Sequence, residues 1–347
     1  MKRLCSALLL SATLLLPAIA AGDEGEERIQ LRMQSLKAFG LGQHAELERM
    51  FEQARTRQTR TSSGVWALTI LDDGLDNAFN ADPRNDALWA QREARVRAWQ
   101  EAYPTSAAAS LAQARLLLSR AWRYRGDGYV GTVKAEDWAP FHDYVDRARA
   151  YLEAHKAVAS VDPRWYDYME DIARYQQWPK EKFAALVDEG LSRHPTYYPL
   201  YFTGVDYHLP KWGGSAEEVE AFARAAVARS RKTEGEGMYA RIYWVVAGSQ
   251  YGDDLVSDSR VDWPMMKRGM HDVLARYPDP WNLNNFAQFA CAAGDREETA
   301  ALMRRLGDEP DPQVWTTPGQ FERCRDGDIG LPKARPRKAA PVRTTRG

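Results

Sequence analysis

The sequence predicts an all-α protein in which short helical hairpins stack into one right-handed superhelix, an α/α solenoid. Apolar residues recur at spacings of three and four over most of the chain, which is the period of a helix with one buried face. Prolines separate these segments at regular intervals, ending one helix and tolerating the start of the next. We expect about twelve to fourteen helices in a single domain over residues 22–330.

The first segment has the features of a secretory leader. Lys2 and Arg3 precede an uncharged run from Leu4 to Ala21, and Ala18-Ile19-Ala20 has the small-x-small pattern of a signal peptidase site. We therefore expect residues 1–20 to be a signal peptide cleaved after Ala20, and the mature protein to be periplasmic or secreted. An uncleaved anchor is the alternative, because the run approaches the roughly 20 residues of a membrane span. No later segment is apolar enough to cross a bilayer.

The apolar stripes then place the helices along the chain. Ser106 is a plausible N-cap for a helix that runs to Arg125, and Ser215-x-x-Glu218 has the pattern of a capping box after the Gly213-Gly214 turn. The breaks are Tyr103–Ser106, Val161–Pro163, Arg193–Thr196 and Arg276–Asp279. The stripes are Phe141, Tyr144, Ala148, Tyr151, Leu152 and His155; Phe183, Leu186, Val187, Gly190 and Leu191; Val219, Phe222, Ala223 and Val227; and Met266, Met270, Val273, Leu274 and Tyr277.

One segment could form a strand instead. Ile242–Val246 is β-branched and aromatic, but no partner strand is evident and the flanking apolar residues keep helical spacing. We predict a buried helix there.

The last unit, Trp281–Leu306, is expected to form two short antiparallel helices hinged at Gly294-Asp295. Gly294 occupies the position of the inter-helix glycine of a tetratricopeptide repeat, and a looser match spans Leu36–Arg55. In the last unit, the residues at the packing positions of such a repeat are Leu283, Phe286, Ala287, Ala290, Thr299, Met303 and Leu306. In the unit at Leu36–Arg55, Gly42, Leu47 and Phe51 have the spacing of Gly294, Thr299 and Met303. The chain therefore resembles tetratricopeptide proteins, whose period is about 34 residues. This resemblance implies a concave face that binds a protein or peptide.

From Trp89 to Cys324 the chain also resembles an uncharacterised bacterial family of secreted, tetratricopeptide-like domains of unknown function. The stretches that carry this resemblance are Ala121–Tyr129, Tyr197–Tyr201, Leu209–Ser215 and Asn282–Asp295. It implies an all-helical fold and no assigned activity.

Two cysteines, Cys291 and Cys324, follow the leader. In an oxidising compartment such a pair is a disulfide candidate, with two buried thiols as the alternative. The chain has no CxxC motif, so neither cysteine redox catalysis nor a cysteine zinc site is indicated.

Charge is distributed unevenly. The formal net charge is −1, to which the leader contributes +2 and residues 332–347 contribute +6, so the body carries −9. An acidic body argues against nucleic-acid binding by the folded part. Residues 331–347 are basic and proline-rich, and we expect them to be disordered. Such a tail is most often simply solvated; the alternative is that it touches an anionic envelope surface.

No catalytic or metal-binding pattern emerges from the sequence, and we expect neither cofactor nor metal. Gly126-x-Gly128-x-x-Gly131 has the glycine spacing of a dinucleotide loop but follows a helix, whereas that chemistry requires a preceding strand. The histidines show no tight metal spacing and GxSxG is absent. His142 and Asp146 predict a surface pair, and Asp167, Glu170 and Asp171 a solvated helix face.

The leading functional hypothesis is an exported, non-enzymatic scaffold that binds a protein or peptide on its concave face. The alternative is a hydrolase or carbohydrate-binding protein with a site in a groove between the loops Gly126–Gly131 and Leu209–Ser215; this alternative requires the two loops to converge. Trp212 is expected to be partly exposed, while most of the 12 tryptophans fill wedges between hairpins. The candidate ligand-binding residues are Asp127, Tyr129, Asp206, His208, Lys211 and Trp212. A purely structural envelope protein is a third possibility, suggested by the basic tail.

Overall fold

The computed structural model describes residues 24–126, 128 and 130–329, and this part of the chain is helical without any β-strand. An isolated bridge joins Arg60 and Trp66. The all-α prediction is therefore confirmed, including the helix over Ile242–Val246. The expected signal peptide and the expected basic tail lie outside the described residues.

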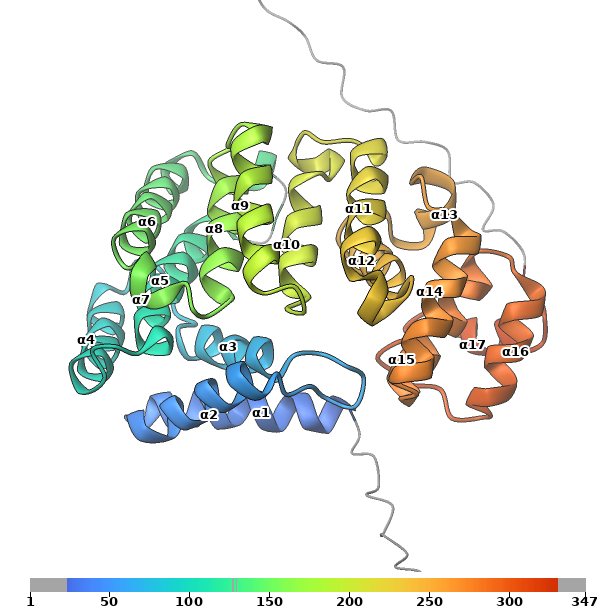
Figure 1. Ribbon diagram of the computed structural model, residues 1–347, viewed down its shortest axis with the longest axis horizontal. Coiled ribbons are helices and arrows are strands. Elements are labelled where there is room, and N and C mark those ends of the chain that lie inside the picture. The colour runs from blue at the N-terminus through green and yellow to red at the C-terminus, as the bar shows by residue number, and fades with distance from the viewer. Residues whose placement is uncertain (1–23, 127, 129, 330–347) are drawn as a thin grey trace, which may run out of the picture.

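The α-helices have between 4 and 20 residues and follow one another along the chain (Figure 1). In chain order they are α1 (Glu24–Gly40), α2 (His44–Arg57), α3 (Ala67–Ala78), α4 (Asp86–Ala102), α5 (Ala107–Arg125), η1 (Val130–Thr132), α6 (Ala135–Ala154), α7 (Lys156–Ala159), α8 (Arg164–Tyr175), α9 (Lys180–Arg193), α10 (Pro199–Tyr207), η2 (Pro210–Trp212), α11 (Ala216–Glu234), α12 (Gly237–Val246), η3 (Ala247–Tyr251), η4 (Gly252–Asp254), α13 (Leu255–Asp258), α14 (Trp263–Arg276), α15 (Pro280–Ala292), α16 (Arg296–Leu306) and α17 (Gln320–Arg325).

The expected caps and turns are found at the starts and ends of these helices. The side chain of Ser106 accepts a hydrogen bond from the amide of Ala109, and that of Ser215 accepts one from Glu218. A cap of this kind stabilises a helix by about 1 kcal/mol. Gly294 has a φ of +73° between α15 and α16, a conformation that glycine adopts without steric cost. The predicted hinge of the last hairpin is therefore confirmed.

The hairpins form an arc with an inner and an outer row of helices (Figure 1). The inner row comprises α5, α8, α10, α12 and α15, in which each helix contacts the next; Trp244 of α12 and Phe286 of α15, for example, have ring centroids 5.5 Å apart. The outer row comprises α6, α9, α11, α14 and α16, each packed against its inner partner. Alternating rows of this kind are the architecture of a helical repeat protein.

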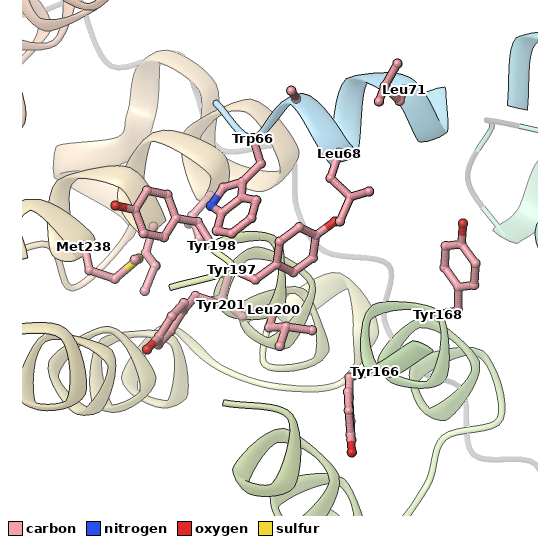
Figure 2. Close-up of a cluster of buried hydrophobic side chains, with 14 of the residues drawn as sticks. Trp66, Leu68, Leu71, Tyr166, Tyr168, Tyr197, Tyr198, Leu200, Tyr201 and Met238 are labelled. Atoms are coloured by element: carbon pink, nitrogen blue, oxygen red, sulfur yellow. The ribbon is translucent and has the colours of Figure 1, made fainter. Parts of the chain in front are cut away.

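The N-terminal helices α1–α3 and the segment 58–66 lie along the inner row. Trp66 donates a hydrogen bond from Nε1 to the carbonyl oxygen of Thr196 (2.8 Å), and its ring meets that of Tyr197 edge-on at 5.1 Å (Figure 2). Further along the arc, the amide of Asn282 on α15 donates to the carbonyl oxygen of Ser63 (3.0 Å). The side of the superhelix predicted to receive a partner is thus covered, from α8 to α15, by the chain's own N-terminal unit.

A buried arginine fixes this unit to the inner row. The side chain of Arg164, at the start of α8, is 1% exposed; its Nη1 lies 3.0 Å from Oδ1 of Asp72 on α3, and its Nη2 lies 2.8 Å from Oδ2 of Asp162. Tyr168 donates a further hydrogen bond to Asp72. Burying these charges is costly, and the cost is offset only because each group has hydrogen-bonded partners.

The cysteine pair forms the predicted disulfide. Cys291 on α15 and Cys324 on α17 are bonded, with their Cα atoms 5.7 Å apart. Closing a loop with a sequence separation of 33 residues stabilises the fold by about 3–4 kcal/mol in the chain-entropy model. No helix of residues 24–126 or 130–329 is both long and apolar enough to cross a bilayer.

The Arg164→Leu variant tests the role of the buried arginine. It removes the cation that Asp162 and Asp72 share and leaves Asp72 with Arg115, 3.6 Å away, so the free energy of unfolding should fall by about 3–5 kcal/mol. Urea unfolding followed by circular dichroism measures this loss. The matched variant Arg49→Leu removes an exposed arginine paired with Glu46 and should leave stability nearly unchanged. Equal losses in both variants would contradict the assigned role.

Candidate functional site

The loops 126–131 and 209–215 converge in space, as the groove hypothesis requires. Gly128 and Val130 on one side and Pro210–Gly213 on the other line a single hollow of about 1440 Å³. Side chains from the last turns of α5 and α8 and from one face of α6, together with Ser249 and Gln250 of η3, line the rest of it. None of the described lining residues belongs to α1–α3, so the hollow lies away from the surface that these helices cover.

A row of aromatic rings crosses the hollow. Trp138 and Phe141 of α6 have centroids 5.9 Å apart, Phe141 and Tyr175 of α8 5.8 Å, and Tyr175 and Trp212 of η2 6.2 Å. Trp122 braces the row, because its Nε1 donates to the hydroxyl of Tyr175 (2.7 Å). Burial raises the pKa of Tyr175, so its hydroxyl stays protonated. The hollow thus has a continuous aromatic surface contributed by three separate segments.

A buried ion-pair network holds Trp212 in place. Arg174, 8% exposed, lies 5.1 Å from the Trp212 ring centroid, and its Nη1 and Nη2 both lie 2.5 Å from carboxylate oxygens, of Asp206 and Asp171 respectively. A guanidinium stacked on an indole and held by two carboxylates has little freedom. Arg125 also stacks on Trp212, at 5.9 Å.

Planar polar side chains form the opposite edge. Oε1 of Gln176 accepts from Nε1 of Trp178 (2.8 Å) and from Nη1 of Arg149 (3.2 Å), while its Nε2 donates to Asp146 (2.6 Å). The next residue, Gln177, adopts a φ of 50°, which is uncommon for a residue other than glycine. This turn after α8 brings both glutamine amides to the hollow.

The predicted site residues meet only in part. Lys211 and Trp212 line the hollow, and Trp212 is half-buried. Asp206 contributes indirectly, through Arg174. His208 does not line the hollow: it packs against Phe183 and Phe222 between α9 and α11, where burial lowers its pKa. Asp127 and Tyr129 lie outside the described residues, although their neighbours Gly128 and Val130 line the hollow.

Other lining residues do not have the roles that the sequence predicts. Most tryptophans, Trp138 and Trp178 among them, are expected to fill wedges between hairpins, and His142 with Asp146 is expected to form a surface pair. All four line the hollow, and the ring of His142 stacks on that of Trp138 at 5.8 Å. Trp138, His142 and Asp146 are spaced four residues apart and therefore lie on one face of α6. This spacing could have predicted that they line the same side of the hollow.

A smaller recess of about 450 Å³ adjoins the hollow behind Trp122 and Tyr175. Its charged groups pair with one another: Arg115 lies 3.6 Å from carboxylate oxygens of both Asp72 and Asp76, and Arg123 lies 3.5 Å from Asp76. No group of three or more histidine, cysteine or acidic residues suited to a metal ion occurs within the described part of the chain.

The acidic turn of α8 is more buried than the sequence suggests. Glu170 is 0% exposed, so the prediction of a solvated face is wrong for this residue. Burial, reinforced by Asp171, raises the pKa of Asp167 to about 7, while its Oδ1 accepts from the hydroxyl of Thr203 (2.6 Å). The inner row therefore carries carboxyl groups that hold protons near neutral pH.

Known sequences offer one point of comparison. Residues 32–165 are similar to a family described as "Domain of unknown function (DUF4034)". This stretch runs from α1 into the start of α8; it includes Trp122 and Trp138 and stops short of the 209–215 loop. No curated protein matches the chain, and no solved structure does so. The expected likeness to a domain of unknown function is confirmed in part: the match overlaps the predicted range of residues 89–324 over residues 89–165.

The pH dependence of stability tests the buried carboxyl. Because the pKa of Asp167 is raised from 3.8 to about 7 in the folded protein, the folded state binds more protons than the unfolded state in this window, and stability falls as the pH rises through it. Asp167→Asn removes this contribution. The unfolding free energy of the variant, relative to the wild type, should therefore increase from about pH 4 to about pH 7 in urea titrations.

The exposed Asp143→Asn on α6 serves as the control and should show no such trend. A relative stability of Asp167→Asn that stays constant, or that decreases with pH, would contradict the assignment.

Proposed function

We propose that this chain is an exported binding protein that takes a carbohydrate in the hollow between η1 and η2. The observation that carries the proposal is the row of aromatic rings from Trp138 to Trp212, bordered by side-chain amides. A hollow that is lined by aromatic side chains and has a small number of polar groups directed into it is typical of a ligand-binding site.

The chemistry of the lining fits a sugar. A pyranose ring presents an apolar C–H face that stacks on an aromatic ring, and a rim of hydroxyls that need both donors and acceptors. Trp138 and Trp212 are half-buried and supply the rings. The side-chain amides of Gln177 and Gln250 supply donors and acceptors, and Gln176 supplies its second N–H, because its oxygen already accepts from Trp178 and Arg149.

The geometry favours this site over the inner side of the arc. The protein or peptide partner expected on the concave face would meet α1–α3 and the segment 58–66 there. Hydrogen bonds from Trp66 to Thr196 and from Asn282 to Ser63 hold that cover in place. The hollow lies outside it, at the ends of α5 and α8.

Export is supported by the leader pattern at residues 1–20 and by the disulfide. A Cys291–Cys324 bond persists in an oxidising compartment and is rare in the cytosol. The absence of a CxxC motif points to a structural role for this bond.

Cleavage of the leader gives a direct test. When the full chain is expressed in a Gram-negative host and recovered from the periplasm, its first residue should be Ala21, because the small-x-small pattern ends at Ala20. Intact-mass spectrometry of that fraction measures the start. A protein that begins at Met1 and stays in the membrane fraction would contradict export by cleavage.

Binding is tested by the Trp212→Ala variant. A panel of neutral and acidic oligosaccharides is titrated against the wild type by intrinsic fluorescence and calorimetry, and at least one should bind. Removing the indole should weaken that binding at least tenfold, about 1.4 kcal/mol, because the stacking surface is lost. Trp212→Phe keeps a ring and should lose less.

The control is Trp281→Ala, which removes a half-buried tryptophan at the far end of the arc, beside Arg28. It should bind as the wild type does. The proposal fails if no sugar binds, or if Trp281→Ala weakens binding as much as Trp212→Ala does.

A further inference from the structure

The charges around the hollow differ from those of the whole body. Among the described lining residues, Arg125, Arg149 and Lys211 are cationic and Asp146 is the one carboxylate. The body of the chain as a whole carries −9. This excess of cations among the described lining residues favours a negatively charged ligand.

Lys211 is the cation best placed to meet such a ligand. It is exposed, precedes Trp212 directly, and donates from Nζ to the carbonyl oxygen of Ser249 (2.7 Å). Its backbone amide is 3.3 Å from Oε1 of Gln250, so η3 holds the residue from two sides. An ammonium has three donors, and this single carbonyl bond leaves capacity for an anion.

The ammonium of Lys211 forms no ion pair with a carboxylate of the described residues, whereas Lys180 nearby on α9 pairs with Glu218. Partial burial of the Lys211 ammonium lowers its pKa, although the residue as a whole is exposed; among its charged neighbours Asp206 opposes this effect while Arg174 and Arg125 add to it. A ligand anion beside Lys211 would offset the two guanidinium groups that disfavour its charge.

The other two cations are held as part of the wall. Arg149 lies over Trp178 at 4.8 Å and pairs with Glu153 at 2.9 Å. Arg125 donates from Nη1 to the carbonyl oxygens of Gly126 (2.8 Å) and Gly128 (3.0 Å). The charge of Arg149 is compensated by Glu153 and Arg125 is bound to the chain's own carbonyl oxygens, so Lys211 is the cation with donors left to contact a ligand.

We propose that the carbohydrate is anionic, and that its ring stacks on Trp212 while its negatively charged group binds the ammonium of Lys211. This inference rests on the proposed function and narrows it to glycans that carry a carboxylate or a sulfate. The adjacency of Lys211 and Trp212 in η2 puts the charge beside the stacking surface.

The experiment compares three short oligosaccharides of equal length by calorimetry on the mature protein: an oligogalacturonide, its methyl ester, and a sulfated oligosaccharide. The ester keeps the rings and removes the charge. At low salt, the wild type should bind at least one charged sugar about tenfold more tightly than the ester, and added salt should reduce this difference. The two charged arms separate carboxylate from sulfate.

Lys211→Gln should abolish the preference for the charged sugar and leave the affinity for the ester within about twofold. The control Lys232→Gln removes an exposed lysine near the end of α11 and should keep the preference. A preference that survives in Lys211→Gln would overturn the assignment of this residue.

The remaining outcomes separate the two proposals. If the charged sugars and the ester bind equally well, the anionic inference fails and carbohydrate binding stands. If a polyglutamate peptide binds as tightly as the charged sugars and the ester does not bind, charge alone governs the site and the carbohydrate proposal fails with it. Absence of binding by all three sugars overturns both.

Discussion

The arrangement of this protein depends on one buried guanidinium, that of Arg164, held between Asp72 on α3 and Asp162 before α8. An arginine at this depth is stable only with both carboxylates in place, so it fixes where α3 lies against α8. With α3 in this position, α1–α3 and the segment 58–66 cover the inner row. The inner surface of the superhelix is therefore covered by the chain's own N-terminal unit, and the hollow that we propose as a ligand site lies outside this cover.

Helix α8 connects this constraint to the hollow. Its first residue is Arg164, and its last two are Arg174 and Tyr175, which hold Trp212 and form the middle of the aromatic row. A single helix of 12 residues therefore sets both the position of the N-terminal unit and the geometry of the candidate site. Because a helix of three turns is stiff, a displacement of Arg164 at the start of α8 would also displace Arg174 and Tyr175 at its end.

The features of the fold that could be predicted from the sequence are those that depend on neighbouring residues or on residue type. Helical periodicity, the serine caps at Ser106 and Ser215, the Gly294 turn and the cysteine pair were all predicted, and the loops around Gly128 and Trp212 converge as the groove hypothesis requires. The remainder depends on contacts between distant segments. Asp72 and Arg164 are 92 residues apart, and no local pattern marks them as partners. Helix periodicity likewise could not show that His208 packs between α9 and α11, or that Phe141 of α6 contacts Tyr175 of α8.

The acidic body constrains how an anionic ligand could reach the hollow. Charges separated by more than about 8 Å are screened at physiological ionic strength, so the −9 of the body matters less than the cations within contact distance. Attraction must then arise at Lys211, Arg149 and Arg125 after the ligand has entered. Long-range steering, which needs a complementary field over the whole surface, would contribute little to the association rate. Affinity for such a ligand would depend mainly on the dissociation rate. That rate would be set by how well the sugar fits against Trp212 and the ammonium of Lys211.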